Sequence, residues 1–173
     1  MYTNLVFSGG GIQCISYIGI LKYIEDNSTL FNIKNIAASS GGSLFALCYI
    51  LGYSYKDLLE LILGLEFEQI RDINTDNIFN FLSHYGLDTG NKLKQLIKII
   101  IKKKTNNENL TFIELYNLYK INLTVTGTCL NNVTTEYFNY INNPEMPIYM
   151  AIRISCSIPF FYNNIEYNDK IYN

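Results

Sequence analysis

The sequence predicts an α/β fold in which a mainly parallel sheet carries helices on both faces. Two short apolar segments, residues 4–7 and 33–38, each end in a turn of small residues, and apolar residues at helical spacing follow each turn. Repeats of strand and helix build parallel sheets through right-handed crossovers. We therefore expect a three-layer α/β domain over residues 1–173, with an inserted helical middle.

The first half of the chain supplies two strand–helix units. Asn4–Phe7 is the first predicted strand, and Ser8–Gly11 breaks it before a helix that ends near Asp26. Ile33–Ala38 is the second predicted strand, and the helix that follows it runs from about Gly42 to Leu51. Glycine and serine at both strand ends are typical of strand-to-helix turns.

The rest of the chain is predicted to be helical and then mixed. Ser54 and Thr111 precede helical patterns and carry the hydroxyl that suits a helix N-cap. Alternation of apolar residues with threonine from Leu123 onward has the two-residue period of a strand. The predicted helices are Tyr55–Leu63, Ile78–Leu82, Lys92–Lys103, Phe112–Leu118 and Ile148–Ile154, and the predicted strands are Leu123–Cys129, Glu136–Tyr140, Ile165–Tyr167 and Ile171–Tyr172.

Composition limits the class of protein. The net charge of −2 argues against a general nucleic-acid binder. No apolar run reaches the roughly 18 residues of a membrane span, and the N-terminus lacks the features of a signal peptide. The four cysteines suggest neither a zinc site nor a disulfide framework. We therefore expect a cytoplasmic protein without a bound metal or cofactor.

One predicted helix departs from this charge balance. Six lysines crowd the segment Lys92–Lys104, whose apolar residues fall on one helical face. The simpler interpretation is a solvated surface face. The alternative is peripheral contact with an anionic membrane surface, which gains weight if the substrate is a lipid.

Ser40 stands at the point where the second strand turns into its helix. Small residues surround it in Ala38–Ser43, and such a turn is strained and tolerates only small neighbours. The turn would present the hydroxyl at the positive end of the helix, which favours a nucleophile. Alternatively, Ser40 is a small residue in a tight turn that caps the helix, with Ser39 or Ser43 as rival caps.

Consecutive glycines at Gly9, Gly10 and Gly11 separate the first strand from its helix. Uncovered backbone N–H groups at a helix start can hold an anion. That anion is either a bound phosphate or the oxyanion of an acyl-transfer intermediate, and a plain turn is the third interpretation. Cys14 stands where the dinucleotide fingerprint requires a glycine, so the oxyanion role is preferred once Ser40 is considered.

A serine nucleophile also needs a group that accepts its proton. His84 is the single histidine of the sequence, and a surface or half-buried role at a helix end is its simpler interpretation. A Ser-His-Asp triad would have to use His84, whereas a Ser-Asp dyad would not.

Taken in order, these segments resemble the patatin-like phospholipases. The resemblance runs from Asn4 to Asn173 and includes the glycine run, the serine turn, Gly127–Thr128 on a strand and the stretch Ala151–Phe160. It implies a lipid acyl hydrolase, a phospholipase A-type serine esterase with a Ser-Asp dyad that acts on a phospholipid or another acyl ester. By the same resemblance, the nucleophile is Ser40, the oxyanion donors are Gly9, Gly10 and Gly11, and apolar residues of the helical middle line the acyl pocket.

The sequence departs from the family pattern at three places. Gln13–Cys14 replaces a basic residue and a glycine, and Ala38 replaces the first glycine of the serine motif. The aspartate of the dyad is expected just beyond Asn173, because Asp169 matches only the preceding hairpin turn. The chain is thus expected to be a patatin-like domain incomplete at its C-terminus. The alternative function is a catalytically silent lipid-binding or interaction module that keeps the pocket.

Overall fold

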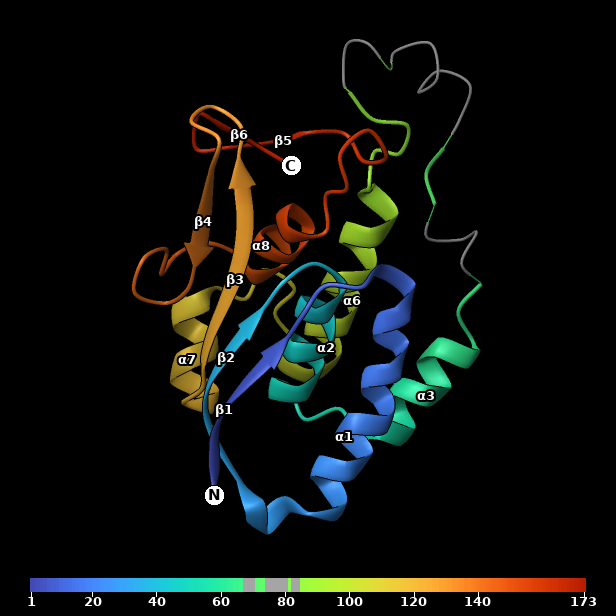
Figure 1. The fold of residues 1–173 in the computed structure, drawn as a ribbon, viewed down its shortest axis with the longest axis vertical. Coiled ribbons are helices and arrows are strands. Elements are labelled where there is room, and N and C mark those ends of the chain that lie inside the picture. Colours follow the sequence, from blue (N-terminus) through green and yellow to red (C-terminus); the bar gives the residue numbers. More distant parts are fainter. Residues whose placement is uncertain (67–70, 74–80, 82–84) are drawn as a thin grey trace.

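The computed structural model describes residues 1–66, 71–73, 81 and 85–173, and the other residues are drawn as the grey trace in Figure 1. The predicted helix Ile78–Leu82 falls almost wholly outside the described residues, and His84 falls wholly outside them.

The described strands form one sheet in the order β1-β2-β3-β6-β5, with β4 also paired to β3. The first three strands run parallel, as predicted, and the others are antiparallel. β4 begins before the predicted Glu136, because the turn after β3 closes at Val133, whose φ is 52°. The strands are β1 (Tyr2–Phe7), β2 (Phe31–Ala38), β3 (Asn122–Cys129), β4 (Thr134–Phe138), β5 (Ile165–Tyr167) and β6 (Lys170–Tyr172).

The described helices agree with the predicted ones to within a few residues. A 3-10 segment that was not predicted, η1 (Gly11–Ser16), precedes the first of them. None of the described helices is both long and apolar enough to cross a bilayer. The helices are α1 (Tyr17–Asp26), α2 (Gly41–Ile50), α3 (Tyr55–Leu63), α6 (Asn91–Thr105), α7 (Phe112–Tyr119) and α8 (Ile148–Ser155), and η2 (Ser28–Leu30) is a further 3-10 turn.

The described helices that pack on the sheet lie on one of its faces (Figure 1). The parallel strands β1, β2 and β3 follow one another toward the same edge of the sheet. Right-handed crossovers therefore place the helices that connect them on the same face. Phe7 and Val125 point into this helical layer and are buried, whereas Val6 and Tyr137 on the opposite face are 76% and 56% exposed. Of the two helical layers expected, the described residues form one.

Helix α2 is the centre of the core and fixes the edge at which the site lies. It is apolar on every side, as a fully enclosed helix must be, and Ala46, Leu47 and Cys48 are buried. It contacts β1, β2, β3, α1 and α8. Its N-terminus lies at the carboxyl edge of the parallel strands, where Phe7 pairs with Ala38.

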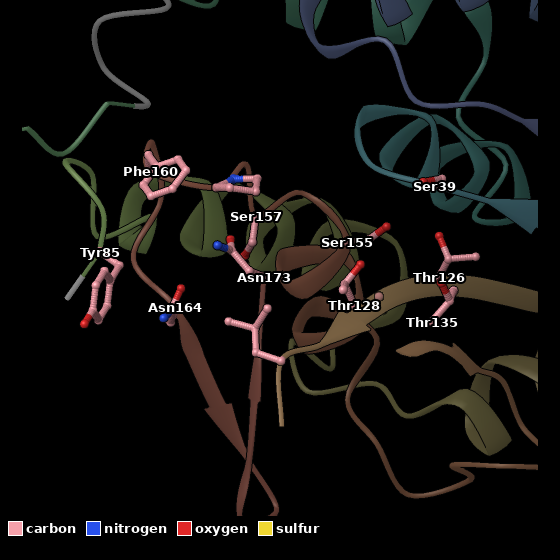
Figure 2. Close-up of a pocket in the computed structure, with 13 residues that line it drawn as sticks. Ser39, Tyr85, Thr126, Thr128, Thr135, Ser155, Ser157, Phe160, Asn164 and Asn173 are labelled. Carbon is pink, nitrogen blue, oxygen red and sulfur yellow. The ribbon is translucent and has the colours of Figure 1, made fainter. Parts of the chain in front are cut away.

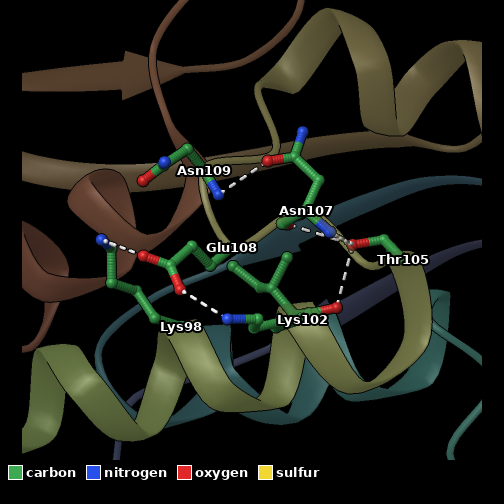
Figure 3. A network of polar contacts seen from close by, with 7 residues as sticks. Lys98, Lys102, Thr105, Asn107, Glu108 and Asn109 are labelled. Atoms are coloured by element: carbon green, nitrogen blue, oxygen red, sulfur yellow. Dashed lines mark hydrogen bonds and ion pairs between the residues drawn. The ribbon is translucent and has the colours of Figure 1, made fainter.

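The lysine-rich helix is α6, and several of its lysines have partners within the chain. Lys98 and Lys102 pair with Glu108 at 3.0 and 3.5 Å, as Figure 3 shows. Lys98 also lies 4.8 Å from the ring centre of Tyr149. Lys104 lies 4.5 Å from that of Tyr53. These contacts fit the interpretation of a surface helix better than that of a bare cationic patch.

The close approach of Gly42 in α2 to the backbone of Ser8 gives a stability prediction. A Cβ atom on Gly42 would lie 2.4 Å from the carbonyl oxygen of Ser8, so Gly42→Ala should destabilise the protein by about 3 kcal/mol or more. Gly19 lies inside α1 with no atom within 4 Å of its Cβ position, so Gly19→Ala should stabilise by roughly 0.5–1 kcal/mol. Urea unfolding of both variants measures the difference, and equal effects would contradict this packing.

Candidate active site

Ser40 occupies a strained turn between β2 and α2. Its φ and ψ are 49° and −136°, a region that residues with a side chain rarely adopt. Contacts on both sides hold this conformation: the Ser40 N–H donates to Ser155 Oγ at 2.8 Å, and the Ser40 carbonyl accepts from the Ser43 N–H at 2.9 Å and from Ser43 Oγ at 2.5 Å. Because strain persists only where the surroundings enforce it, Ser40 is a marked position of the fold.

The glycine run lies directly beside Ser40. A Cβ atom on Gly9 would lie 3.0 Å from Ser40 Cβ and 3.8 Å from Ser40 Oγ. A Cβ atom on Gly41 would lie 3.0 Å from the carbonyl oxygen of Gly11. The structure therefore brings the predicted nucleophile and the predicted oxyanion segment together, as the sequence required.

The geometry at the start of η1 suits an anion. Gly10 precedes the segment and accepts a hydrogen bond from the Gln13 N–H at 3.0 Å, while Gly11 has a φ of 53°. The first N–H groups of a helical segment have no acceptor within it. Those groups at Gly10 and Gly11 are therefore suited to donate to a negative oxygen formed next to Ser40.

Ser40 lines an apolar cavity of about 350 Å³. Gly11 and Gly41 lie in its lining with Ser40, and apolar side chains supply most of the rest. These side chains come from α3, α6, α8 and the loop after α8, and include Leu61, Ile62, Leu93, Leu96, Ile97, Ile100, Ile152 and Phe161. The helical middle of the chain thus does line a cavity that reaches the serine.

Ser39 lines a different cavity, of about 740 Å³, which is rich in hydroxyl and amide groups (Figure 2). In this view, the Ser155 and Thr128 side chains lie between Ser39 and Asn173. The Asn173 N–H donates to the carbonyl oxygen of Thr128 at 3.0 Å, so β6 brings residue 173 to the carboxyl edge of β3. Two consecutive serines therefore lie in the linings of an apolar and a polar cavity.

The described lining of both cavities includes no aspartate, glutamate or histidine. Asp88 is fully buried, but its carboxylate accepts the N–H groups of Gly90 and Asp72 at 2.7 and 2.8 Å and so organises the loop before α6. Asp169 is exposed in the turn between β5 and β6 with a φ of 60°, the turn role that was predicted. No described carboxylate is therefore placed to serve as the base.

The structural role of Arg153 was not predicted from the sequence. Arg153 is 3% exposed on α8 and donates to Ser157 Oγ at 2.7 Å and to the carbonyl oxygen of Thr89 at 3.1 Å. Its guanidinium carbon also lies 4.5 Å from the ring centre of Tyr162, which lines the apolar cavity. Arg153 thus links α8 to the loop before α6 and to Tyr162 in the cavity wall. A single cation inside the apolar run Ile148–Ile154 was the available signal.

Cys14 and Cys156 lie next to the serine turn. Cys14 Sγ would contact a Cβ atom on Gly41 at 3.1 Å, and Cys156 lines the apolar cavity. Burial raises the pKa of the Cys156 thiol to about 11 and also raises that of Cys14. Both thiols are therefore neutral near pH 7 and act as small apolar groups.

A comparison of the sequence with models of known protein families identifies the family of this chain. The family model described as patatin-like phospholipase matches residues 5–173. The chain belongs to the patatin-like phospholipase family. The sequence resemblance and the α/β fold class are both confirmed.

Two curated relatives and one solved structure that the chain matches are longer than the chain. It is 31% identical over 170 residues to an uncharacterized protein of Acanthamoeba polyphaga mimivirus, covering 98% of this chain and 56% of the relative. It is 23% identical over 173 residues to "Probable lipid hydrolase 463L" of Invertebrate iridescent virus 6, covering 99% and 58%. The crystal structure of VipD from Legionella pneumophila has a TM-score of 0.70 at 17% identity, covering 99% of this chain and 45% of that one. The patatin-like chain thus spans little more than half of the two curated relatives.

The buried arginine gives a testable stability difference. Arg153→Met should destabilise the protein by about 3 kcal/mol, because it leaves Ser157 Oγ and the Thr89 carbonyl without their buried donor. Lys102→Met removes an exposed cation from α6 and should cost less than about 1 kcal/mol. Thermal and urea unfolding compare the two variants. Similar small losses would mean that the hydrogen bonds of Arg153 to Ser157 and Thr89 contribute little to stability.

Proposed function

We propose that this patatin-like protein is a lipid acyl hydrolase of the phospholipase A type, with Ser40 as its nucleophile. The observation that carries the proposal is the strained Ser40 turn, which lies against the glycine run and in the lining of an apolar cavity. An acyl chain in that cavity would bring its ester carbonyl to Ser40 Oγ. The N–H groups of Gly10 and Gly11, next to Gly9, would hold the oxyanion.

The proposed reaction has two halves. Ser40 Oγ attacks the ester carbonyl and gives its proton to the base, and the tetrahedral oxyanion then expels the alcohol, which takes up that proton. Water, deprotonated by the same base, attacks the acyl-enzyme, and the fatty acid leaves as Ser40 recovers its proton. The proposed steps use no metal or cofactor.

We propose that the base is an aspartate that follows Asn173. The described cavity lining lacks a carboxylate, and residue 173 lines the polar cavity together with Ser39 and Ser155. A residue next in sequence would thus lie at the carboxyl edge of β3, on the side of Ser155, whose Oγ accepts the Ser40 N–H. Residues 1–173 alone should then hydrolyse esters slowly, because removing one partner of a catalytic group of this kind costs a factor of about 10⁴.

The second candidate function is a silent lipid-binding module. The same absence of a described carboxylate near Ser40 favours it. Such a module would bind an acyl chain in the apolar cavity, but its Ser40 hydroxyl would not react.

A fluorophosphonate probe separates the two candidates. A protein that continues past Asn173 with an aspartate should be labelled once, at Ser40, and Ser40→Ala should abolish the label, because the probe needs an activated hydroxyl beside an oxyanion site. Ser39→Ala is the matched control and should keep the label, because Ser39 lies in the other cavity. Intact-mass spectrometry and peptide mapping give the readout.

The same assay shows which outcome rejects which function. Labelling that persists in Ser40→Ala would reject the hydrolase, and labelling of Ser40 in the unmodified chain would reject the silent module. A protein that continues past Asn173 with an aspartate should hydrolyse a p-nitrophenyl ester about 10⁴-fold faster than residues 1–173. Equal rates would reject the proposed base.

A further inference from the structure

Exposed apolar side chains surround the opening of the Ser40 cavity. Ile12 on η1 is 63% exposed and Ile158 in the loop after α8 is 49% exposed, yet both line the same cavity as Ser40. Phe160, two residues further along that loop, is 66% exposed but lines the polar cavity instead. Single exposed apolar residues are ordinary, but Ile12 and Ile158 come from two distant segments and line the same cavity.

We propose that the rim of the Ser40 cavity, defined as Ile12 and Ile158, inserts into the surface of a lipid aggregate. The inference rests on the proposed function, because it assigns the route by which an acyl chain reaches Ser40. A chain that left a bilayer through water would expose each of its methylene groups at a cost in free energy. A mouth seated in the lipid surface avoids that cost, since the hydrocarbon then passes directly from lipid to an apolar cavity.

The rim fits a lipid surface better than the lysine-rich helix does. Lys98 and Lys102 on α6 pair with Glu108, and the cation of Lys104 lies over the Tyr53 ring. These cations already have partners within the chain, whereas the rim side chains extend from the opening of the cavity itself. Binding should therefore occur on uncharged phosphatidylcholine and should change little with salt.

Co-sedimentation with phosphatidylcholine vesicles tests the rim. Ile12→Asp and Ile158→Asp should each lower the partition coefficient by about fivefold or more, because a carboxylate resists entry into lipid. Ile141→Asp is the matched control, since Ile141 is 67% exposed between β4 and α8 and lines neither cavity, and its partition should not change. Circular dichroism and thermal unfolding establish that each variant is folded.

Three results would contradict the proposal that the rim inserts into a lipid surface. The first is that the unmodified protein does not bind the vesicles, and the second is that Ile141→Asp loses as much binding as the rim variants. The third is binding that requires anionic lipid and disappears in high salt, which would assign the contact to the lysines of α6.

Fluorophosphonate labelling in solution measures the reactivity of Ser40 independently of vesicle binding, so the rim and the proposed function are tested separately. Labelled Ser40 in a protein that does not bind vesicles would reject the rim alone. Rim-dependent vesicle binding without labelling would support the rim and reject only the hydrolase.

Discussion

The backbone of the Ser8–Gly11 segment touches the start of α2 with no space for a side chain between them. A Cβ atom on Gly42 would overlap the Ser8 carbonyl, and one on Gly9 would press on Ser40. This contact fixes the distance between the two strand-to-helix turns, because each turn is carried by one of two paired parallel strands. The strained serine, the N–H groups of the glycine run and the cavity between them all depend on that single close approach.

Helix α8 supports the same turn from the other side. Its last residue, Ser155, accepts the Ser40 N–H, while Arg153 two residues earlier binds the loop that precedes α6. One short helix therefore links the Ser40 turn to the loop before α6. This explains why a fully buried cation is kept in an otherwise apolar segment, where its desolvation is costly and must be offset by hydrogen bonds.

Local patterns were sufficient to predict most of the elements and the meeting of Ser40 with the glycine run. Period-two and helical spacing specify strands and helices, and parallel crossovers place consecutive turns at one edge. Arg153 was not predicted, because its partners Ser157 and Thr89 depend on a tertiary contact between α8 and the loop before α6. The exposed sheet face that carries Val6 was not predicted either, because the number of helical layers depends on the direction in which strands are added.

A crystal structure of the protein reacted with a long-chain alkyl fluorophosphonate tests the central geometry most directly. We expect phosphorus on Ser40 Oγ, a phosphoryl oxygen about 3 Å from the N–H of Gly10 or Gly11, and the alkyl chain between α3 and α6. An adduct whose phosphoryl oxygen faces away from the glycine run, or whose chain lies in the polar cavity beside Ser39, would contradict it.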